Sequence, residues 1–167
     1  MEEGSGSALR TVLFICTGNV YRSRYAEAYF NHLARRESLP LRAFSRGLRV
    51  ELVEVDISPY TIEALERRGI GRDMTAPGRR NLTVDDLERA DLVVALRESE
   101  HRPIIAERFP QWESRLRYWD VADHPEWSAD RMVAAVERNI EELVEELRRS
   151  LPRSQGSTGP RTARKRG

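Results

Sequence analysis

The single cysteine of this chain lies in a segment whose residue types suit the binding and transfer of a phosphate group. Residues 16–23 read Cys-Thr-Gly-Asn-Val-Tyr-Arg-Ser, so five residues separate Cys16 from Arg22. A loop that wraps an anion must turn several backbone N–H groups inward. Gly18 and Asn19 are residue types that tolerate the left-handed conformations this requires. The segment therefore predicts an anion cradle with a thiol at its start.

The polar side chains of this loop also suit nucleophilic chemistry at phosphorus. Thiolates are stabilised at helix N-termini and beside cationic groups, and the thiolate is the nucleophilic form of cysteine. The planar fork of Arg22 can bind two phosphate oxygens, while Ser23 can donate a hydrogen bond to the thiolate. Cys16 is thus predicted to attack phosphorus. The alternative is an inert, buried cysteine in an ordinary turn between a strand and a helix.

The elements around the loop follow from hydrophobic periodicity. Residues 11–15 form an apolar run that predicts a buried strand, and the apolar face of residues 26–33 predicts the helix after the loop. The alternation continues with a strand near residues 42–45, a helix starting after Ser58, a capping box at Thr83 and Asp86, an apolar run at 92–96, a helix ending before Pro110, a short strand at 116–119 and a helix from Ser128 to Pro152. Such alternation predicts a parallel sheet covered on both faces, with ligands at the carboxyl ends of the strands.

Length and composition predict a single domain. The chain has 167 residues, of which 40% are hydrophobic. We expect a flexible N-terminus at residues 1–8, a phosphate-handling domain at 9–150 and a basic, disordered tail at 151–167. No segment approaches the roughly 18 apolar residues of a membrane-spanning helix, and no signal peptide is evident. A cytoplasmic protein is therefore expected, with no nucleic-acid partner and no membrane span.

The cysteine loop resembles the signature of the low-molecular-weight protein tyrosine phosphatase family, where it lies near the N-terminus and ahead of the first helix. The resemblance continues through residues 26–27, 45–47 and 90–92, through His101 and through the Phe-Pro pair at 109–110. It implies a three-layer α/β/α fold with a central four-stranded parallel sheet. It also implies a phosphatase that needs no metal or organic cofactor and hydrolyses phosphotyrosine-like phosphomonoesters through a phosphocysteine intermediate.

This resemblance assigns roles to the residues of the loop. Cys16 is the nucleophile, Arg22 binds phosphate, Asn19 holds the loop in shape and Ser23 activates the thiol. The residues expected to contact the substrate are Thr17, Gly18, Asn19, Val20, Tyr21 and Ser23. The expected ligands are a phosphorylated protein or a small aryl phosphate, with phosphate or a similar oxyanion in the loop.

The proton donor is less directly indicated, because the family takes it from an Asp-Pro pair that is interrupted here. Asp123 is separated from Pro125 by His124. Asp123 is the expected donor, with Asp120 and His124 as alternatives. Without an effective acid, the protein would be a non-catalytic module that binds phosphate or phosphopeptides.

Other departures from the family pattern concern redox chemistry, loop support and substrate choice. Tyr21 stands where many members have a second cysteine, which removes a protective disulfide and argues against the related arsenate reductases. Arg24 stands where proline is frequent. Relatives acting on phosphoarginine tend to have threonine in place of Val20, so a protein arginine phosphatase is the alternative within this class. Trp127 and Trp119 are candidates to flank a phenyl ring, although core packing is favoured for Trp119.

Overall fold

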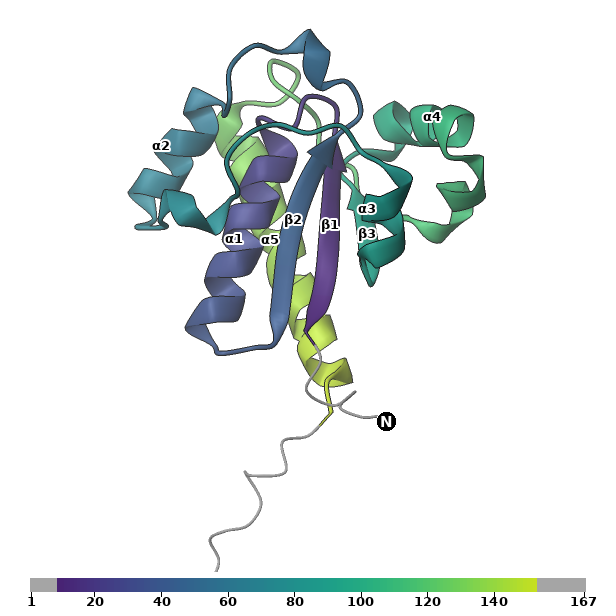
Figure 1. Cartoon of the computed structure of the whole chain (residues 1–167). Coiled ribbons are helices and arrows are strands. Elements are labelled where there is room, and N and C mark those ends of the chain that lie inside the picture. Colours follow the sequence, from purple (N-terminus) through teal and green to yellow (C-terminus); the bar gives the residue numbers. More distant parts are fainter. Residues whose placement is uncertain (1–8, 153–167) are drawn as a thin grey trace, which may run out of the picture.

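Four parallel strands form the centre of the computed structural model, which describes residues 9–152 (Figure 1). The strands are β1 (Arg10–Cys16), β2 (Leu41–Gly47), β3 (Leu92–Ala95) and β4 (Arg117–Tyr118), in the spatial order β2-β1-β3-β4. Cys16 pairs with Gly47 and Ile15 with Ala95, so the carboxyl ends of three strands meet around the cysteine. The expected four-stranded parallel sheet is confirmed. The segments expected to be flexible, 1–8 and most of 151–167, lie outside the described residues.

Within residues 9–152, five α-helices connect and cover the strands. They are α1 (Arg22–Arg36), α2 (Pro59–Arg67), α3 (Val84–Arg89), α4 (Glu98–Arg108) and α5 (Ala129–Ser150). Three 3-10 helices in the same range of residues, η2 (Val50–Leu52), η3 (Arg72–Met74) and η4 (Pro110–Arg115), were not predicted, because one or two turns are too short to show a hydrophobic period. Over residues 9–152, no helix combines the length and the apolar character needed to cross a membrane.

The predicted helix starts are confirmed by their capping contacts. Ser58 Oγ accepts from the backbone N–H of Tyr60 at 3.1 Å, ahead of α2. Thr83 and Asp86 each accept a hydrogen bond from the other's backbone N–H, which completes the capping box of α3. Ser128 Oγ accepts from the backbone N–H of Arg131 at 3.1 Å, ahead of α5. These contacts satisfy N–H groups that the first turn of a helix leaves without partners.

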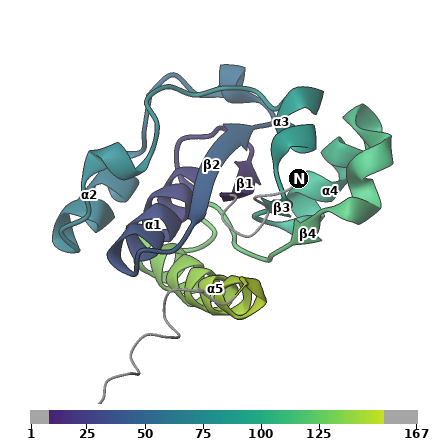
Figure 2. The ribbon, with the colours of Figure 1, turned by 60° about the horizontal axis from the view of Figure 1, so that its bottom comes forward.

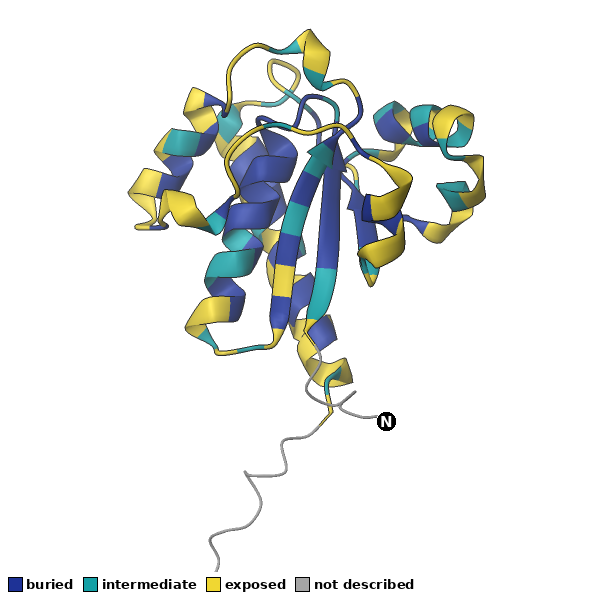
Figure 3. Ribbon diagram, in the orientation of Figure 1, coloured by how far each residue is buried: buried dark blue, intermediate teal, exposed yellow. Residues whose placement is uncertain are grey.

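The core lies on both faces of the sheet, as the alternation of β1 requires. Val12 and Phe14 pack against α1 and α5 on one face, while Leu13 and Ile15 pack toward α3 and α4 on the other. Figure 2 shows α1 and α5 together on one side of the strands, and Figure 3 shows β1 buried along most of its length. The structure is therefore the expected three-layer α/β/α arrangement.

Side-chain and loop contacts line the outer edge of β2. The Asn31 amide of α1 accepts from the N–H of Ala43 at 2.8 Å and donates to its carbonyl at 3.1 Å. Further along β2, Gly47 N donates to Arg80 O at 2.8 Å and Gly47 O accepts from Leu82 N at 2.8 Å. These contacts bring the segment before α3 beside the carboxyl end of β2, next to the cysteine loop.

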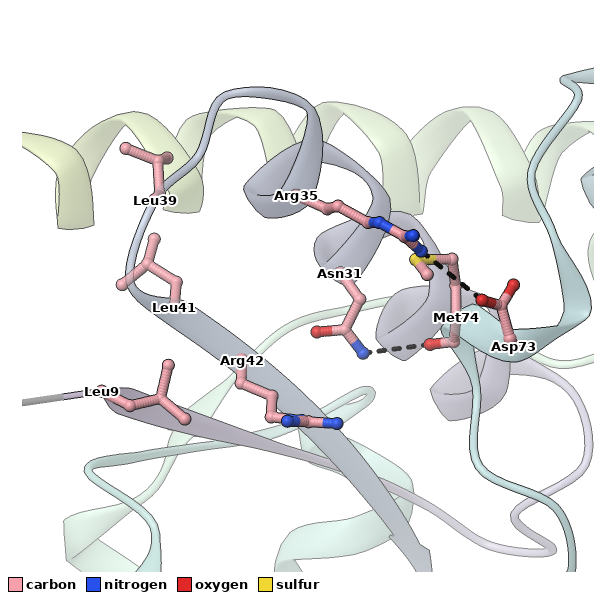
Figure 4. A pocket seen from close by; sticks show the side chains of 8 residues that line it. All are labelled: Leu9, Asn31, Arg35, Leu39, Leu41, Arg42, Asp73 and Met74. Carbon is pink, nitrogen blue, oxygen red and sulfur yellow. Dashed lines mark hydrogen bonds and ion pairs between the residues drawn. The ribbon is translucent and has the colours of Figure 1, made fainter.

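A hollow of about 350 Å³ lies near the amino end of β2, away from Cys16 (Figure 4). The residues that line it are Leu9, Asn31, Arg35, Leu39, Leu41, Arg42, Asp73 and Met74. Arg35 pairs with Asp73 at 3.4 Å, and the Asn31 amide donates to Met74 O at 3.0 Å. These polar contacts join α1 to η3, so the side chains have a structural role at this end of the sheet.

Candidate active site

The loop of residues 16–23 joins the end of β1 to the start of α1, whose first turn has no side-chain cap. Uncapped N–H groups at a helix N-terminus attract anions. Asn19 adopts a left-handed conformation with φ 59°, as expected, but Gly18 does not. The value of Gly18 is its lack of a side chain, because a Cβ there would lie 2.6 Å from Val53 Cγ2.

Cys16 is buried and contacts a hydroxyl group from the first turn of α1. Its Sγ lies 3.0 Å from Ser23 Oγ. Asn19 Nδ2 donates to the same oxygen at 3.1 Å, which leaves the Ser23 hydrogen free to point at sulfur. Asn19 Nδ2 also donates to Ser45 Oγ at 3.0 Å, and Asn19 Oδ1 accepts from Arg80 N at 3.1 Å. This geometry fits the roles expected for Asn19 and Ser23.

The buried guanidinium of Arg22 is bound on its end by Glu100. Nη1 donates to Glu100 Oε1 and to Val121 O, both at 2.9 Å, and Nη2 donates to Glu100 Oε2 at 2.7 Å. Nε and the hydroxyl of Tyr21 are the only buried side-chain polar atoms of residues 9–152 without a hydrogen-bond partner. Nε and Nη2 form the side-on fork of a guanidinium, which can bind two phosphate oxygens. Arg22 thus keeps Nε for an anion, while Nη2 also donates to Asp123 Oδ2 at 3.4 Å.

Glu100 is itself held by two neighbours, Thr17 and His101. The Thr17 hydroxyl donates to Glu100 Oε2, and His101 Nε2 lies 3.3 Å from the same oxygen. His101 Nδ1 accepts from Arg97 N at 3.0 Å, so the proton of the neutral ring is on Nε2, facing Glu100. Burial opposes ionisation of Glu100, but hydrogen bonds from His101, Arg22 and Thr17 hold its pKa well below the usual range. Glu100 is therefore an ionised carboxylate that orients Arg22.

Arg24 is almost fully buried, with 1% of its surface exposed, and it joins α1 to two loop segments. Nε donates to Thr75 Oγ1 at 2.7 Å. Nη1 donates to Asp56 O and Nη2 to Ala76 O, each at 2.8 Å. The residue that replaces the family's frequent proline is therefore a structural cation behind the cysteine loop.

A buried carboxylate, Glu27, links Arg24 to the cysteine loop. Glu27 Oε1 accepts from Thr75 Oγ1 at 2.8 Å and from Ser45 Oγ at 2.6 Å. Burial raises the pKa of Glu27, while its hydrogen bonds and the charge of Arg24 act in the opposite direction. Because Ser45 also binds Asn19, a continuous set of hydrogen bonds leads from Arg24 to the sulfur of Cys16.

The three candidate proton donors lie in different surroundings. Asp123 Oδ2 lies 3.4 Å from Arg22 Nη2, and about half of its side chain is exposed, at 51%. The Asp120 side chain is 83% exposed and pairs with Arg97 at 3.4 Å. His124 stacks on an aromatic ring, as described below. Of the three, Asp123 is the one seen in contact with Arg22, the residue expected to bind phosphate.

Aromatic side chains from three segments gather beside Asp123. The ring of Tyr60, from α2, lies 4.8 Å from that of His124 and 6.0 Å from that of Tyr21. Tyr60 Oη lies 3.3 Å from His124 Nε2. Burial, and then the charge of Asp123, raises the pKa of Tyr21 to about 12, so its hydroxyl stays protonated at neutral pH.

The two tryptophans proposed as flanking residues pack elsewhere. Trp119 lies against Phe14 in the core, with ring centroids 5.7 Å apart, as favoured for it from the sequence. Trp127 is partly buried against the same core and is covered by the guanidinium of Arg131 at 4.0 Å. Neither joins the Tyr60–His124 stack.

Several residues of the site were not identified from the sequence. Glu100 directly precedes His101, but nothing local marks it as the partner of Arg22. Arg24 and Glu27 are three positions apart on α1, a spacing that brings side chains together on a helix. Two opposite charges at that spacing on the face of α1 that carries its apolar residues could have indicated a buried pair. Tyr60 carried no signal, since its partner lies 64 positions away.

Comparisons with known proteins agree with this geometry. Residues 11–156 match the model of the low molecular weight phosphotyrosine protein phosphatase family. The protein-arginine-phosphatase of Bacillus subtilis (strain 168) is 31% identical over 150 residues, covering 84% of this chain and 95% of that protein. The low molecular weight protein-tyrosine-phosphatase YfkJ of the same organism is 36% identical over 89 residues, covering 52% of this chain and 55% of that protein.

Solved structures share the fold. The crystal structure of a low molecular weight protein tyrosine phosphatase from T. tengcongensis has a TM-score of 0.71 at 25% identity, covering 82% of this chain and 99% of that chain. The structure of the YwlE arginine phosphatase, a mutant with a phosphorylated active-site serine, has a TM-score of 0.71 at 27% identity, covering 85% and 99%.

Proposed function

Because the chain belongs to the low molecular weight phosphotyrosine protein phosphatase family and is a cysteine-dependent phosphatase, we propose that it hydrolyses phosphotyrosine-like groups of proteins through a phosphocysteine on Cys16. One observation carries the proposal. Cys16 Sγ lies 3.0 Å from a hydroxyl donor at an uncapped helix N-terminus, in a loop closed by an arginine whose Nε has no partner. A nucleophile, a thiolate donor and an arginine Nε without a partner thus stand in one loop.

In the first step, the thiolate of Cys16 attacks phosphorus in line with the leaving oxygen. The S–P bond forms as the P–O bond to the phenol breaks. The loop N–H groups and the Nε–Nη2 edge of Arg22 hold the three equatorial oxygens. Asp123, at 3.4 Å from Arg22 Nη2, gives its proton to the departing phenolic oxygen.

In the second step, water hydrolyses the phosphocysteine. The carboxylate of Asp123 accepts a proton from the attacking water, the new P–O bond forms and the S–P bond breaks. Cys16 leaves as a thiolate, which the Ser23 hydroxyl stabilises by donating a hydrogen bond. Inorganic phosphate is released, and Asp123 is protonated again for the next cycle.

Val20 supports an aryl phosphate as the substrate. Its side chain is apolar and largely buried against the core, with 9% exposed. An isopropyl group can contact a phenyl ring but offers no acceptor for the N–H groups of a guanidinium. Phosphoarginine is the second candidate, because the relative matched over 95% of its length is a protein-arginine-phosphatase.

Hydrolysis of 4-nitrophenyl phosphate in the presence of EDTA tests the mechanism. We expect turnover by the wild type, none by Cys16→Ser, and a reduced rate for Asp123→Asn. Rapid mixing should give a burst of nitrophenol, and mass spectrometry of acid-quenched protein should show a phosphoryl group on Cys16. Wild-type protein that binds vanadate but gives no burst would establish a binding module instead of an enzyme.

A pair of peptides that differ only in phosphotyrosine or phosphoarginine tests the substrate class. The expected result is a higher kcat/KM for phosphotyrosine in the wild type. Val20→Thr adds a hydroxyl with little change in volume, and we expect it to shift the ratio toward phosphoarginine. A wild type that prefers phosphoarginine would instead assign the protein to the second candidate.

A further inference from the structure

The loop between β4 and α5 carries Asp123, and its anchoring is uneven. Before Asp123, the loop is fixed to the sheet, since Val121 N donates to Leu96 O at 2.8 Å and Val121 is fully buried. Asp123 itself is half exposed. Its Oδ1 accepts from the adjacent His124 N at 2.8 Å, and its contact with Arg22 is long, at 3.4 Å. After Asp123, Trp127 N donates to Asp123 O at 3.1 Å and Arg97 binds both carboxylate oxygens of Glu126, but neither contact holds the Asp123 side chain.

His124, next to Asp123, supplies a contact between this loop and α2. Its ring stacks on Tyr60 with centroids 4.8 Å apart and an interplanar angle of 30°. Tyr60 Oη and His124 Nε2 are 3.3 Å apart, a distance at which either can donate according to the imidazole tautomer. The two side chains come from segments 64 positions apart, so the stack joins the acid loop to α2.

The first turn of α2 is in turn fixed to the cysteine loop. Ser58 N donates to Val20 O at 2.8 Å, and Thr61 Oγ1 donates to Tyr21 O at 3.2 Å. The ring of Tyr21 also packs edge-on against that of Tyr60. Tyr60 therefore stands at a fixed place relative to the loop that holds the phosphate.

We propose that Tyr60 and His124 act as a pair of positioning residues that hold Asp123 over the bound phosphoryl group. This inference rests on the proposed function, in which Asp123 is the proton donor. It also gives a role to His124, the residue that interrupts the Asp-Pro pair. The His124 side chain connects the loop to α2, while the adjacent Asp123 contacts Arg22. Proton transfer needs a donor within hydrogen-bond reach of the leaving oxygen, so a loosened loop lowers the rate of that transfer.

Leaving-group dependence tests the proposal, because a proton donor matters most for a poor leaving group. Turnover of phenyl phosphate and of 4-nitrophenyl phosphate, whose phenol is more acidic, is compared for Tyr60→Ala, Tyr60→Phe and His124→Ala. Asp123→Asn sets the effect of losing the donor. Tyr29→Phe is the matched control for Tyr60→Phe, because it also removes a hydrogen-bonded tyrosine hydroxyl. The Tyr29 hydroxyl donates to Glu141 at 2.6 Å, between α1 and α5.

We expect Tyr60→Ala and His124→Ala to lower kcat/KM, which reports the first step alone, roughly 10- to 100-fold for phenyl phosphate and by less than about 3-fold for 4-nitrophenyl phosphate. Tyr60→Phe keeps the stack and should fall between these variants and the wild type. Tyr29→Phe should match the wild type on both substrates. The double variant His124→Ala with Asp123→Asn should be no slower than Asp123→Asn alone, because both changes act on one proton transfer.

Other outcomes would overturn the inference, and they separate it from the proposed function. Equal losses of kcat/KM on both substrates, or multiplied losses of kcat/KM in the double variant, would mean that Tyr60 and His124 contact the substrate instead of positioning Asp123. If Asp123→Asn lost the same fraction of kcat/KM on both substrates, Asp123 would not be the proton donor and this inference would fail. Hydrolysis through Cys16 would still stand. A wild type inert toward 4-nitrophenyl phosphate would refute the proposed function itself.

Discussion

Replacing Arg24 by methionine should destabilise the protein far more than removing an exposed arginine. Methionine fills a similar length but cannot donate the hydrogen bonds at 2.7, 2.8 and 2.8 Å to Thr75, Asp56 and Ala76. Hydrogen bonds from charged groups each contribute about 1.5–3 kcal/mol, and removing one partner of a buried charged network costs about 3–5 kcal/mol. The two backbone carbonyls lie in partly exposed loops and can bind water. We therefore expect a loss near the lower end, about 3 kcal/mol.

Urea unfolding followed by tryptophan fluorescence measures this loss. The control is Arg67→Met, which removes the same side chain from an exposed pair with Glu63 and should hardly change the midpoint. Arg24→Met with Glu27→Gln completes a double-mutant cycle. A neutral amide in place of the Glu27 carboxylate leaves no buried negative charge for Arg24 to balance. The free energy of unfolding of the double variant should therefore be about 1–2 kcal/mol higher than the sum of the two single losses predicts.

Two results would refute this reasoning about Arg24. One is a midpoint for Arg24→Met that equals the midpoint of the Arg67→Met control. The other is strict additivity in the cycle with Glu27→Gln, which would show that the two side chains do not act as one network. Because that network ends at Cys16, Arg24→Met should also lower kcat under conditions where the variant is fully folded.

Two further predictions concern the cysteine loop and the residue that binds its arginine, Glu100. The folded-state pKa of Glu100 lies below its ordinary value, so its ionised form stabilises the protein above about pH 4.3 and this contribution is lost as the pH falls further. Glu100→Gln should thus flatten the acid-side decline of Tm between about pH 5 and pH 2, which calorimetry can follow; an unchanged pH profile would contradict the ion pair with Arg22. Gly47→Ala places a Cβ 2.9 Å from Thr17 O and 2.9 Å from Asn19 Cβ, so the loop must move. Vanadate binding should weaken about tenfold, the equivalent of about 1.4 kcal/mol, while wild-type affinity would show that the loop yields without cost.

The parts of the structure that could be predicted from the sequence are those written in local patterns. The caps at Ser58 and Ser128 and the capping box of Thr83 with Asp86 depend on contacts within about four positions, and each was confirmed. The cysteine loop is local as well, since one turn joins the thiol to the first turn of a helix.

The supporting contacts of the site could not be predicted in this way, because each joins distant parts of the chain. Glu100 meets Arg22 across 78 positions, and Tyr60 meets His124 across 64. The sequence shows that Arg24 replaces the proline frequent in the family. The role of Arg24 could not be predicted, because its partners, Thr75 and the loop carbonyls, are brought near only by the fold. Patterns within an element predict that element, whereas the electrostatics of a site depend on how separate elements meet.

The lined edge of β2 has a consequence for encounters between copies of this protein. An outer strand with unpaired backbone groups is a template on which another chain can add a strand and aggregate. At Ala43 the amide of Asn31 imitates a neighbouring strand, with one acceptor and one donor, and at Gly47 the backbone of Arg80 and Leu82 does the same. A foreign strand would have to displace both before it could pair with β2. The Asn31 amide, which binds α1 to the sheet, therefore also opposes aggregation by strand addition at this edge.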